Sequence, residues 1–254
     1  MPKKIMLPVL DDRLFLIASM VREGGVPLDV GTDHAYVPIY LIKSGICRHA
    51  VASDVNRQPL TNACVNAQKF GVFEKINFCL GNGIADIHPE QYEVTDIIIA
   101  GMGGELIAEI IDNSDYTRIP GIRLILQPMS SLQELRGYLA EMGYATIDEK
   151  LCRAGDKYYT CIVAEYDGIR REVPPVRLLI GDVARNEADP LVNGFLEATC
   201  EKLVKKIKGR RMGGLPTARE EEMHREICEM AKARDFYIPS LDESLISSVD
   251  GTEK

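Results

Sequence analysis

Short apolar segments alternate with helical segments from residue 11 to residue 143, and this alternation constrains the fold more than any other feature of the chain. The segments expected to form strands are residues 26–31, 49–54, 75–83, 95–104 and 122–128. The segments expected to form helices are residues 11–23, 37–45, 57–70, 105–113 and 131–142. A helix between two strands returns the chain to the start of the sheet, so the strands run parallel and helices cover both faces. The pattern therefore predicts an α/β fold with a mostly parallel, Rossmann-like sheet.

The pattern changes after residue 144. Residues 145–167 predict two strands joined by a turn at 154–156, which adds an antiparallel hairpin to one edge of the sheet. Two prolines within 168–177 then interrupt any element. Residues 193–208 and the segment after Thr217 each carry a narrow apolar stripe, which predicts an antiparallel helical hairpin. Thr217 and Glu220 have the spacing of a capping box at the start of the second helix.

We therefore expect two domains. The first is a Rossmann-like catalytic domain over residues 1–167, and the second is a helical extension over residues 168–254. The tail from about residue 236 is expected to be loosely held, as chain ends without a clear apolar pattern are.

Composition excludes several classes of protein. The seven cysteines are scattered and form no Cys-x-x-Cys pair, which indicates reduced thiols in a cytoplasmic protein and no metal site or disulfide framework. No apolar run approaches the roughly 20 residues of a membrane span, and the N-terminal lysines are not followed by the apolar segment of a secretory signal. The net charge of −8 argues against general nucleic-acid binding, so any role with RNA requires a local basic patch.

The loops after the first four strands are the candidate ligand site, because open α/β sheets bind ligands outside the carboxyl ends of their strands. These loops contain Asp29, Val30, Gly31, Thr32, Asp33 and His34; Asp54, Val55 and Asn56; Gly81, Asn82 and Gly83; and Ala100, Gly101, Met102, Gly103 and Gly104.

Two polar residues of these loops suit an adenosine ligand. Asp54 lies 23 residues after Gly31, which is the separation expected of a carboxylate that binds both ribose hydroxyls. Asn82 has an amide that can pair with an adenine edge. The structural alternatives are that Asp54 caps the helix at 57–70 and that Asn82 is a turn residue beside glycines.

The first loop distinguishes between two adenosine-containing cofactors. A dinucleotide brings a pyrophosphate, which needs bare backbone N–H groups, whereas this loop retains only Gly31 and adds the acidic Asp33. S-adenosylmethionine carries no phosphate, and its reactive centre is a sulfonium cation that neighbouring carboxylates favour. Asp29, at the end of the first strand, is the acidic residue usual in such sites. The loop therefore indicates a methyl donor rather than a hydride carrier.

Six blocks resemble the bacterial tRNA (adenine-22-N1)-methyltransferases, which are class I methyltransferases with a helical C-terminal extension. In chain order the blocks are "DVGTDHAYVPIYL", "ASDVN", "GNG", "IAGMGG", "LILQPM" and "RAGDKYY". The resemblance is good over residues 10–166 and only general over residues 167–235. It implies methyl transfer from S-adenosylmethionine to N1 of an adenine in the D-arm region of tRNA.

The resemblance also implies site residues. The family's cofactor residues correspond to Asp29, Gly31, Asp54, Asn82 and the segment Gly101–Gly103. The Asn/Asp-Pro-Pro-aromatic motif of the base N6-methyltransferases is absent after the fourth strand, where "AGMGG" stands instead. This difference fits a target nitrogen other than the exocyclic amino group.

The polar residues of the first loop then gain candidate catalytic roles. Methylation of N1 puts a positive charge on the adenine ring, and a carboxylate near its amino edge stabilises that charge. We assign this role to Asp33, with His34 orienting Asp33 or contacting the substrate. Tyr36, Tyr158 and Tyr159 are candidates for stacking on the target base, which must leave its stack or pair to be reached. The alternatives are a helix cap for Asp33, a structural histidine for His34 and packing roles for the tyrosines.

Positive charge gathers in two places that can contact tRNA phosphates. One is the tip of the helical hairpin, with Lys202, Lys205, Lys206, Lys208, Arg210 and Arg211, and the other is the N-terminus, with Lys3, Lys4 and Arg13. The alternative is that the hairpin charges form a solvated helix face. We expect a monomer with tRNA as its partner and no contact with a membrane. Two other functions stay open: a methyltransferase for a small molecule or protein, and a non-catalytic scaffold that binds S-adenosylmethionine or RNA.

Overall fold

The computed structural model describes residues 6–183, 186 and 188–247. The chain forms two compact units, Met1–Glu172 and Val173–Lys254. Residues 168–172 extend the first unit beyond the predicted boundary because their backbone returns to it: the Arg171 N–H donates to the Ala140 carbonyl at 2.8 Å.

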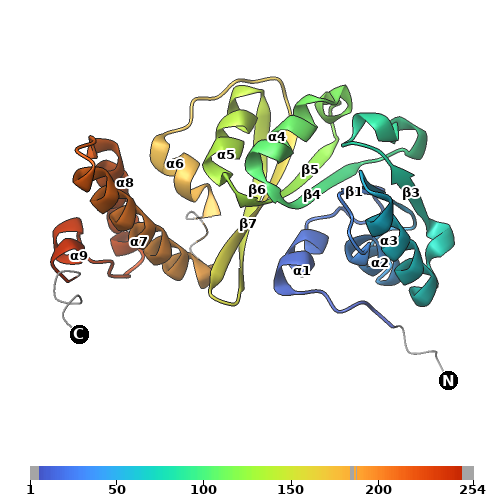
Figure 1. Cartoon of the computed structure of the whole chain (residues 1–254), viewed down its shortest axis with the longest axis horizontal. Coiled ribbons are helices and arrows are strands. Elements are labelled where there is room, and N and C mark those ends of the chain that lie inside the picture. Colours follow the sequence, from blue (N-terminus) through green and yellow to red (C-terminus); the bar gives the residue numbers. More distant parts are fainter. Residues whose placement is uncertain (1–5, 184–185, 187, 248–254) are drawn as a thin grey trace. The chain divides into compact units, whose positions relative to one another are not determined.

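The first unit is built on a seven-stranded sheet in the order β3-β2-β1-β4-β5-β7-β6 (Figure 1). The strands are β1 (Pro27–Val30), β2 (Ala50–Asp54), β3 (Ile76–Leu80), β4 (Asp96–Gly103), β5 (Arg123–Ser130), β6 (Tyr144–Ala154) and β7 (Lys157–Tyr166). Strands β1 to β5 pair in parallel, whereas β7 is antiparallel to both β5 and β6. This topology confirms the predicted Rossmann-like sheet with an antiparallel hairpin at one edge. The strand order reverses between β1 and β4, so a ligand site is expected at the carboxyl ends of these two strands.

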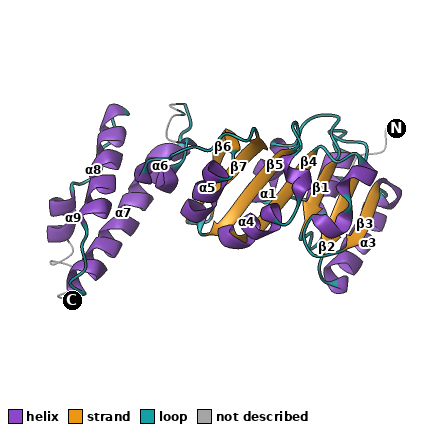
Figure 2. Cartoon of the chain, turned by 90° about the horizontal axis from the view of Figure 1, so that it is seen from above, coloured by secondary structure: helices purple, strands orange, loops and turns teal. Residues whose placement is uncertain are grey.

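Helices cover both faces of the sheet (Figure 2). The helices α1 (Asp12–Ser19), α2 (Tyr36–Lys43) and α3 (Arg57–Phe70) pack on one face, and α4 (Gly104–Asp112) and α5 (Leu132–Glu141) pack on the other. Short 3-10 helices connect the larger elements: η1 (Phe73–Lys75), η2 (Ala85–Ile87), η3 (Pro89–Tyr92) and η4 (Asp115–Arg118). Strand β4 is buried from both sides: Ile98 faces the first core, and Ile97 and Ile99 face the second. A strand buried on both faces needs the continuous apolar run that predicted it.

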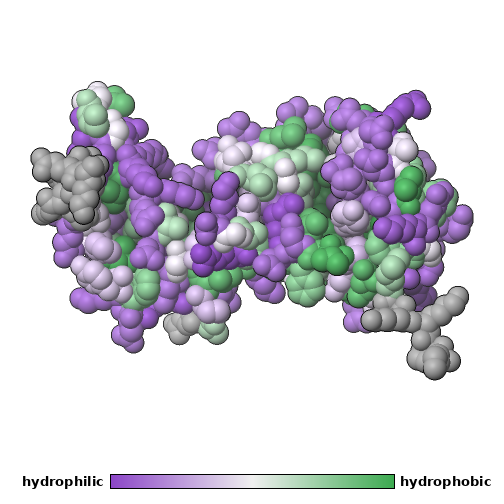
Figure 3. Space-filling model, turned by 60° about the horizontal axis from the view of Figure 1, so that its bottom comes forward, coloured by the Kyte–Doolittle hydropathy of each residue, from purple (hydrophilic) through white to green (hydrophobic). Residues whose placement is uncertain are grey.

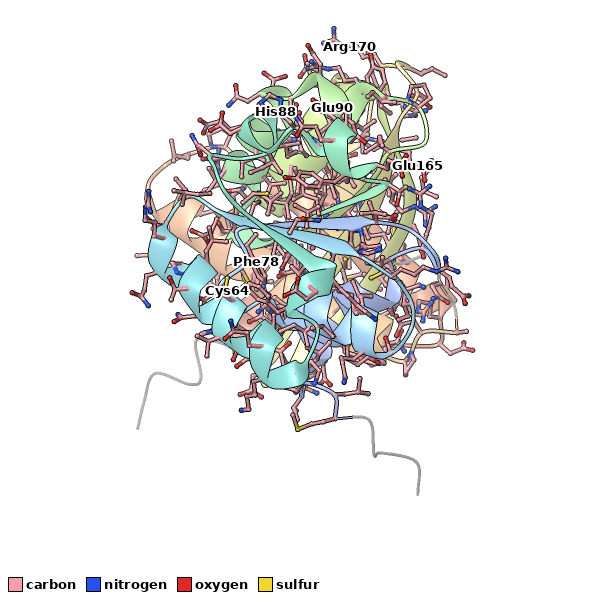
Figure 4. The ribbon with its side chains drawn as sticks, turned by 90° about the vertical axis from the view of Figure 1, so that its right-hand side faces the viewer. Cys64, Phe78, His88, Glu90, Glu165 and Arg170 are labelled. Atoms are coloured by element: carbon pink, nitrogen blue, oxygen red, sulfur yellow. The ribbon has the colours of Figure 1, made fainter. Side chains whose placement is uncertain are left out.

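The same two-sided arrangement is visible from the β3 end of the sheet in Figure 4. Cys64 of α3 and Phe78 of β3 lie on one side, and His88 and Glu90 of the η2–η3 segment lie on the other. His88 Nδ1 is 3.4 Å from Glu90 Oε1, and both side chains are exposed.

The local signals placed most elements within a few residues. Helix α3 has the predicted bounds and ends at Gly71, which adopts φ +69°. Helix α1, whose start either Asp11 or Asp12 could cap by sequence, is capped by Asp11: the Leu14 N–H donates to the Asp11 carboxylate at 2.7 Å. It ends at Ser19, earlier than its apolar pattern suggested.

The second unit contains α6 (Pro175–Ile180), α7 (Leu191–Met212), α8 (Ala218–Ala233) and α9 (Leu241–Ser247). The predicted stripe on α7 is buried throughout: Phe195, Leu196, Thr199, Cys200, Leu203, Val204 and Ile207. Helices α7 and α8 pack antiparallel, since Lys206 and Arg211 of α7 meet Glu220 and Glu221 at the start of α8. The predicted helical hairpin is therefore present.

Three features of this unit differ from the expectations. The break predicted at 168–177 is present over residues 167–174 but ends earlier than expected, because the fixed φ of Pro175 suits the first position of α6. The capping box is wrong: Thr217 makes no cap hydrogen bond, and its hydroxyl donates to Glu221 while Glu220 is buried beside Lys206. The stretch expected to be a loosely held tail contains α9, and residues 248–254 lie outside the described residues.

The face shown in Figure 3 is mostly hydrophilic, with hydrophobic residues gathered in small groups. In the part of the chain that the structure describes, no helix has the length and apolar character to span a bilayer.

Candidate functional site

The loop after β1 is fixed to the neighbouring strand through its backbone. Gly31 adopts φ +75°, which permits the turn. The N–H groups of Gly31 and Thr32 both donate to the Ser53 carbonyl of β2, at 2.9 and 2.8 Å. Thr32 is buried, so this part of the loop is part of the rigid sheet edge rather than a free connection.

Asp29 presents an acid in a partly dry environment at the end of β1. Its side chain accepts a hydrogen bond from the Thr32 hydroxyl at 2.6 Å. Burial raises the pKa of Asp29 to about 6, the Thr32 hydrogen bond opposes the rise, and the nearby Asp54 carboxylate adds to it. A cation bound beside Asp29 would favour its ionised form.

Asp54 ends β2 next to this loop. The Asn56 N–H donates to Asp54 Oδ1 at 2.7 Å, and the cap position of α3 belongs to Asn56, which makes no side-chain cap hydrogen bond. The alternative that Asp54 caps α3 is therefore wrong. Val55, which follows Asp54, is exposed and offers an apolar surface at the same edge.

The loop after β3 lies next to Asp54. The Gly81 N–H donates to the Asp54 carbonyl at 3.1 Å. The Asn82 N–H donates to Asp86 Oδ2 at 3.0 Å, which leaves the exposed Asn82 amide side chain at the rim, and Gly83 turns the chain with φ +76°.

The glycine-rich segment Ala100–Gly103 is the irregular end of β4 rather than a separate loop. Its pairing with β5 shifts register around Gly101, which adopts φ +79°, and resumes at Gly103 opposite Ser130. Met102 leans over the β1 loop, where a methyl group added to Gly31 would overlap the Met102 Cε atom. The segments that the sequence singled out on β1 and β4 are thus in contact.

Asp33, His34 and Tyr36 form a connected group ahead of α2. The His34 Nε2 atom is 3.2 Å from Asp33 Oδ2, and the His34 and Tyr36 rings stack with centroids 5.3 Å apart. Asn66 of α3 fixes the loop by donating to the His34 carbonyl at 3.1 Å. The alternative that Asp33 caps α2 is wrong, because the cap residue is Ala35 at φ +53°. The Asp33 side chain is 72% exposed, so it is accessible to a ligand.

The hairpin tyrosines reach the same edge of the sheet from further away. Strand β7 pairs antiparallel with β5, so its first residues, including Tyr158 and Tyr159, lie at the carboxyl end of β5. Two strands, β4 and β5, separate them from the β1 loop. Within the hairpin, the Arg153 guanidinium lies over the Tyr158 ring, 5.7 Å from its centroid.

Arg13, expected only as part of an N-terminal basic patch, also lies at this edge. Its Nη1 donates to the buried Gln127 at 2.9 Å and lies 3.5 Å from where a Cβ of Gly101 would be. Helix α1 therefore brings a guanidinium beside the end of β4. The only sign of this position in the sequence is that Arg13 directly follows Asp11 and Asp12 at the start of α1. Lys3 and Lys4 lie outside the described residues.

The basic residues of α7 divide into two groups. Lys206 and Arg210 lie 3.1 and 3.8 Å from Glu220, and Arg211 lies 2.8 Å from Glu221. These three positive charges are therefore partly balanced by two carboxylates within the hairpin. Lys202 and Lys205 are exposed on α7, and Lys208 is half-buried near its end.

The donor set at the sheet edge fits an adenosine ligand with a cationic centre. Asp29 and Asp54 place two carboxylates on adjacent strands, and the ends of β3 and β4 add an amide and open glycine backbone. Paired acids favour a positively charged ligand over a phosphate.

Comparison with known proteins agrees with this geometry. Residues 10–162 match the family model described as "Methyltransferase domain". The chain is 35% identical over 167 residues to the tRNA (adenine(22)-N(1))-methyltransferase of Bacillus subtilis (strain 168), covering 63% of this chain and 69% of that protein.

Two solved structures extend the likeness to most of the chain. A Streptococcus agalactiae protein of the NADB-Rossmann superfamily superimposes with a TM-score of 0.77 at 28% identity, covering 89% of this chain and 99% of that one. Streptococcus pneumoniae Sp1610, solved in complex with S-adenosyl-L-methionine, superimposes with a TM-score of 0.75 at 31% identity, covering 86% and 99%.

Proposed function

The chain belongs to the family of tRNA (adenine(22)-N(1))-methyltransferases. We propose which of its residues bind the cofactor, the target base and the rest of the tRNA when N1 of adenine 22 is methylated. The enzyme uses S-adenosylmethionine. The observation that carries this function is the 35% identity over 167 residues to the Bacillus subtilis enzyme. The match to the methyltransferase-domain model covers residues 10–162, which span the candidate residues at the sheet edge.

The ends of the parallel strands bind the cofactor. Asp29 faces its cationic methionine part, Asp54 accepts hydrogen bonds from the ribose hydroxyls through Oδ2, and the Asn82 amide pairs with the adenine edge. Val55 and Asn56 border the adenosine, with Gly81 and Gly83 beside them. The remaining contacts come from backbone at Gly31 and from the end of β4, at Ala100, Gly101, Met102 and Gly103.

Burial makes Asp29 an effective partner for a cation. A carboxylate with a pKa of about 6 is held in a poorly solvated place, where a positive charge gains more from it than in water. When bound, S-adenosylmethionine supplies an electrophilic methyl group, and the electron pair of the broken S–C bond stays on sulfur.

Asp33 stabilises the charge that develops on the target base. The N1 lone pair forms the new bond, so the adenine ring becomes cationic and no proton has to leave. The Asp33 carboxylate accepts a hydrogen bond from the N6 amino group that strengthens as this charge grows. His34, 3.2 Å from Asp33, holds the carboxylate in place, and Tyr36 stacks on the base next to His34.

Contacts with the rest of the tRNA come from three places. Arg13, beside Gly101, contacts a phosphate near the target nucleotide. Tyr158 and Tyr159 provide ring surface at the hairpin. On α7, Lys202, Lys205 and Lys208 contact other phosphates. Lys206, Arg210 and Arg211 make smaller contributions because Glu220 and Glu221 of α8 partly balance their charges. We expect a monomer that acts in the cytoplasm, where its tRNA substrate is.

Transfer of labelled methyl groups to two matched tRNA transcripts tests the function. One transcript carries adenine at position 22, and the other carries guanine there. We expect 1-methyladenosine in the first transcript and no label in the second. Label found in protein, in small molecules or equally in both transcripts would contradict the proposal, and cofactor binding without any transfer would indicate a non-catalytic scaffold.

A further inference from the structure

The second unit holds a group of metal-ligating side chains for which the methyltransferase function has no use. Cys200 of α7 and His224 and Cys228 of α8 bring their ligand atoms within 4.8 Å of one another. Cys200 and His224 are each 2% exposed, and Cys228 is half-buried.

The packing of the helical hairpin creates this group. His224 and Cys228 are four residues apart and therefore lie on the same face of α8. Their atoms Nδ1 and Sγ are 3.5 Å apart. Cys200 comes from the opposing apolar stripe of α7, and its thiol has the Cys228 thiol as a hydrogen-bond partner. The carbonyl of Pro239 lies 3.8 Å from the Cys228 sulfur.

The protein alone satisfies the His224 ring poorly. Within the described residues, its buried Nε2 atom has no hydrogen-bond partner, and Nδ1 meets only a thiol, which is a weak partner. Buried polar groups in folded proteins are nearly always hydrogen-bonded. An ion shared with the Cys228 thiol would give Nδ1 a strong partner in place of the thiol, whereas one ion binds one ring nitrogen and does not satisfy Nε2. A histidine with a purely structural role would more commonly meet a carboxylate or a backbone carbonyl.

The ligand types and spacing select the metal. Two thiolates and one imidazole are typical ligands of Zn²⁺, with Zn–S bonds of about 2.3 Å and Zn–N bonds of about 2.0 Å. Two sulfur ligands on a tetrahedral ion are then about 3.8 Å apart. Atoms already within 4.8 Å of one another reach this spacing by small side-chain rotations.

We propose that Cys200, His224 and Cys228 bind one Zn²⁺ ion between α7 and α8, with water as the fourth ligand on the half-buried side of Cys228. The ion fixes the two helices of the hairpin against each other. This site differs from the expectation, drawn from scattered cysteines, that the chain has no metal ligands. Cys200 lies 24 and 28 residues from the other two ligands, so sequence spacing alone does not show the group.

Metal loading of the purified full chain tests the site. The reduced chain is washed with a chelator, dialysed against Zn²⁺ or Co²⁺, and passed through a desalting column. We expect about one zinc per chain by elemental analysis, with a Kd below about 1 μM against a chromophoric chelator. With cobalt we expect thiolate-to-metal charge-transfer absorption and the visible bands of a tetrahedral site.

Variants locate the bound metal. The double variant C200S/C228S should lose both the zinc and the cobalt bands, and H224Q should weaken zinc binding at least about tenfold. C64S is the matched control, because it removes a half-buried thiol from α3 in the first unit and should retain full loading. The proposal is wrong if the wild-type chain retains no zinc above the chelator-washed blank, if C64S loses as much metal as C200S/C228S, or if thiol counting finds Cys200 and Cys228 joined as a disulfide.

Discussion

Cofactor affinity should depend on pH through Asp29. The pKa of this carboxyl is about 6 in the free chain, so it is about 9% ionised at pH 5 and about 91% ionised at pH 7. If the cationic cofactor binds the ionised form, its Kd should be about tenfold weaker at pH 5 than at pH 7, a difference of about 1.4 kcal/mol. An aspartate with an ordinary pKa near 3.9 would be more than about 90% ionised at both values and would give almost no change.

Isothermal titration calorimetry with S-adenosylmethionine between pH 5 and pH 7 measures this dependence without tRNA. The interval lies below the range in which the cofactor's own amino group titrates. D29N should bind more weakly at pH 7 and show no pH dependence. D156N is the matched control, since Asp156 is a fully exposed carboxylate at the hairpin turn and should leave the curve unchanged.

The contribution of Asp29 to the stability of the cofactor-free chain should change with pH in the opposite sense to cofactor affinity. Because the folded-state pKa of Asp29 is raised, the folded state holds more protons than the unfolded state between about pH 4 and pH 6. Asp29 therefore stabilises the cofactor-free chain at the acidic end of this interval, and that contribution is lost as the pH rises through 6. The proposed role of Asp29 in cofactor binding would be contradicted by a Kd for S-adenosylmethionine that is equal at pH 5 and pH 7. It would also be contradicted if D29N kept the pH dependence of the wild-type Kd.

Three further substitutions test other parts of the structure. D33A should lower turnover at least about tenfold, or about 1.4 kcal/mol, with little change in cofactor Kd, because the role proposed for the exposed Asp33 carboxylate is to stabilise the charge on the base. Single-turnover kinetics and calorimetry measure the two effects, and unchanged turnover would remove Asp33 from catalysis. G31A should lower the free energy of unfolding in urea by more than G24A. Both glycines have φ near +76°, so each alanine costs about 1 kcal/mol in backbone strain, but only at Gly31 does the new methyl group meet another side chain, that of Met102. Equal losses would show that the Met102 side chain moves aside at little cost. R136M should cost about 3–5 kcal/mol of unfolding free energy, because it removes the guanidinium that lies 2.9 Å from the buried Glu149 carboxylate. A loss near zero in urea denaturation would mean that the buried pair does not stabilise the fold.

The sequence predicted the first unit well because its elements are specified locally. The apolar run of β4, the Asp11 cap of α1 and the terminal glycine of α3 each act within a few residues. Where a side chain had two local uses, the structure was needed to choose. Glu220 fits a capping box by spacing, yet it pairs with Lys206 because α7 brings a cation to the start of α8.

Long-range contacts account for what the sequence left out of the site. Arg13 and Gln127 are 114 residues apart, so their hydrogen bond at the sheet edge has no signal in either segment. The loops themselves could be predicted because parallel strands always end at the same edge. The assignment of particular atoms to the ribose, the adenine and the target base stays a prediction.

The backbone of the β1 loop has a consequence for selectivity among metabolites. The N–H groups of Gly31 and Thr32 point at the carbonyl of Ser53 and not toward a ligand. ATP and other adenosine nucleotides share the base and sugar of the methyl donor. Because these two N–H groups already donate to the adjacent strand, they are not available to bind a triphosphate. Adenosine nucleotides should therefore compete poorly for the enzyme even where their adenosine parts fit.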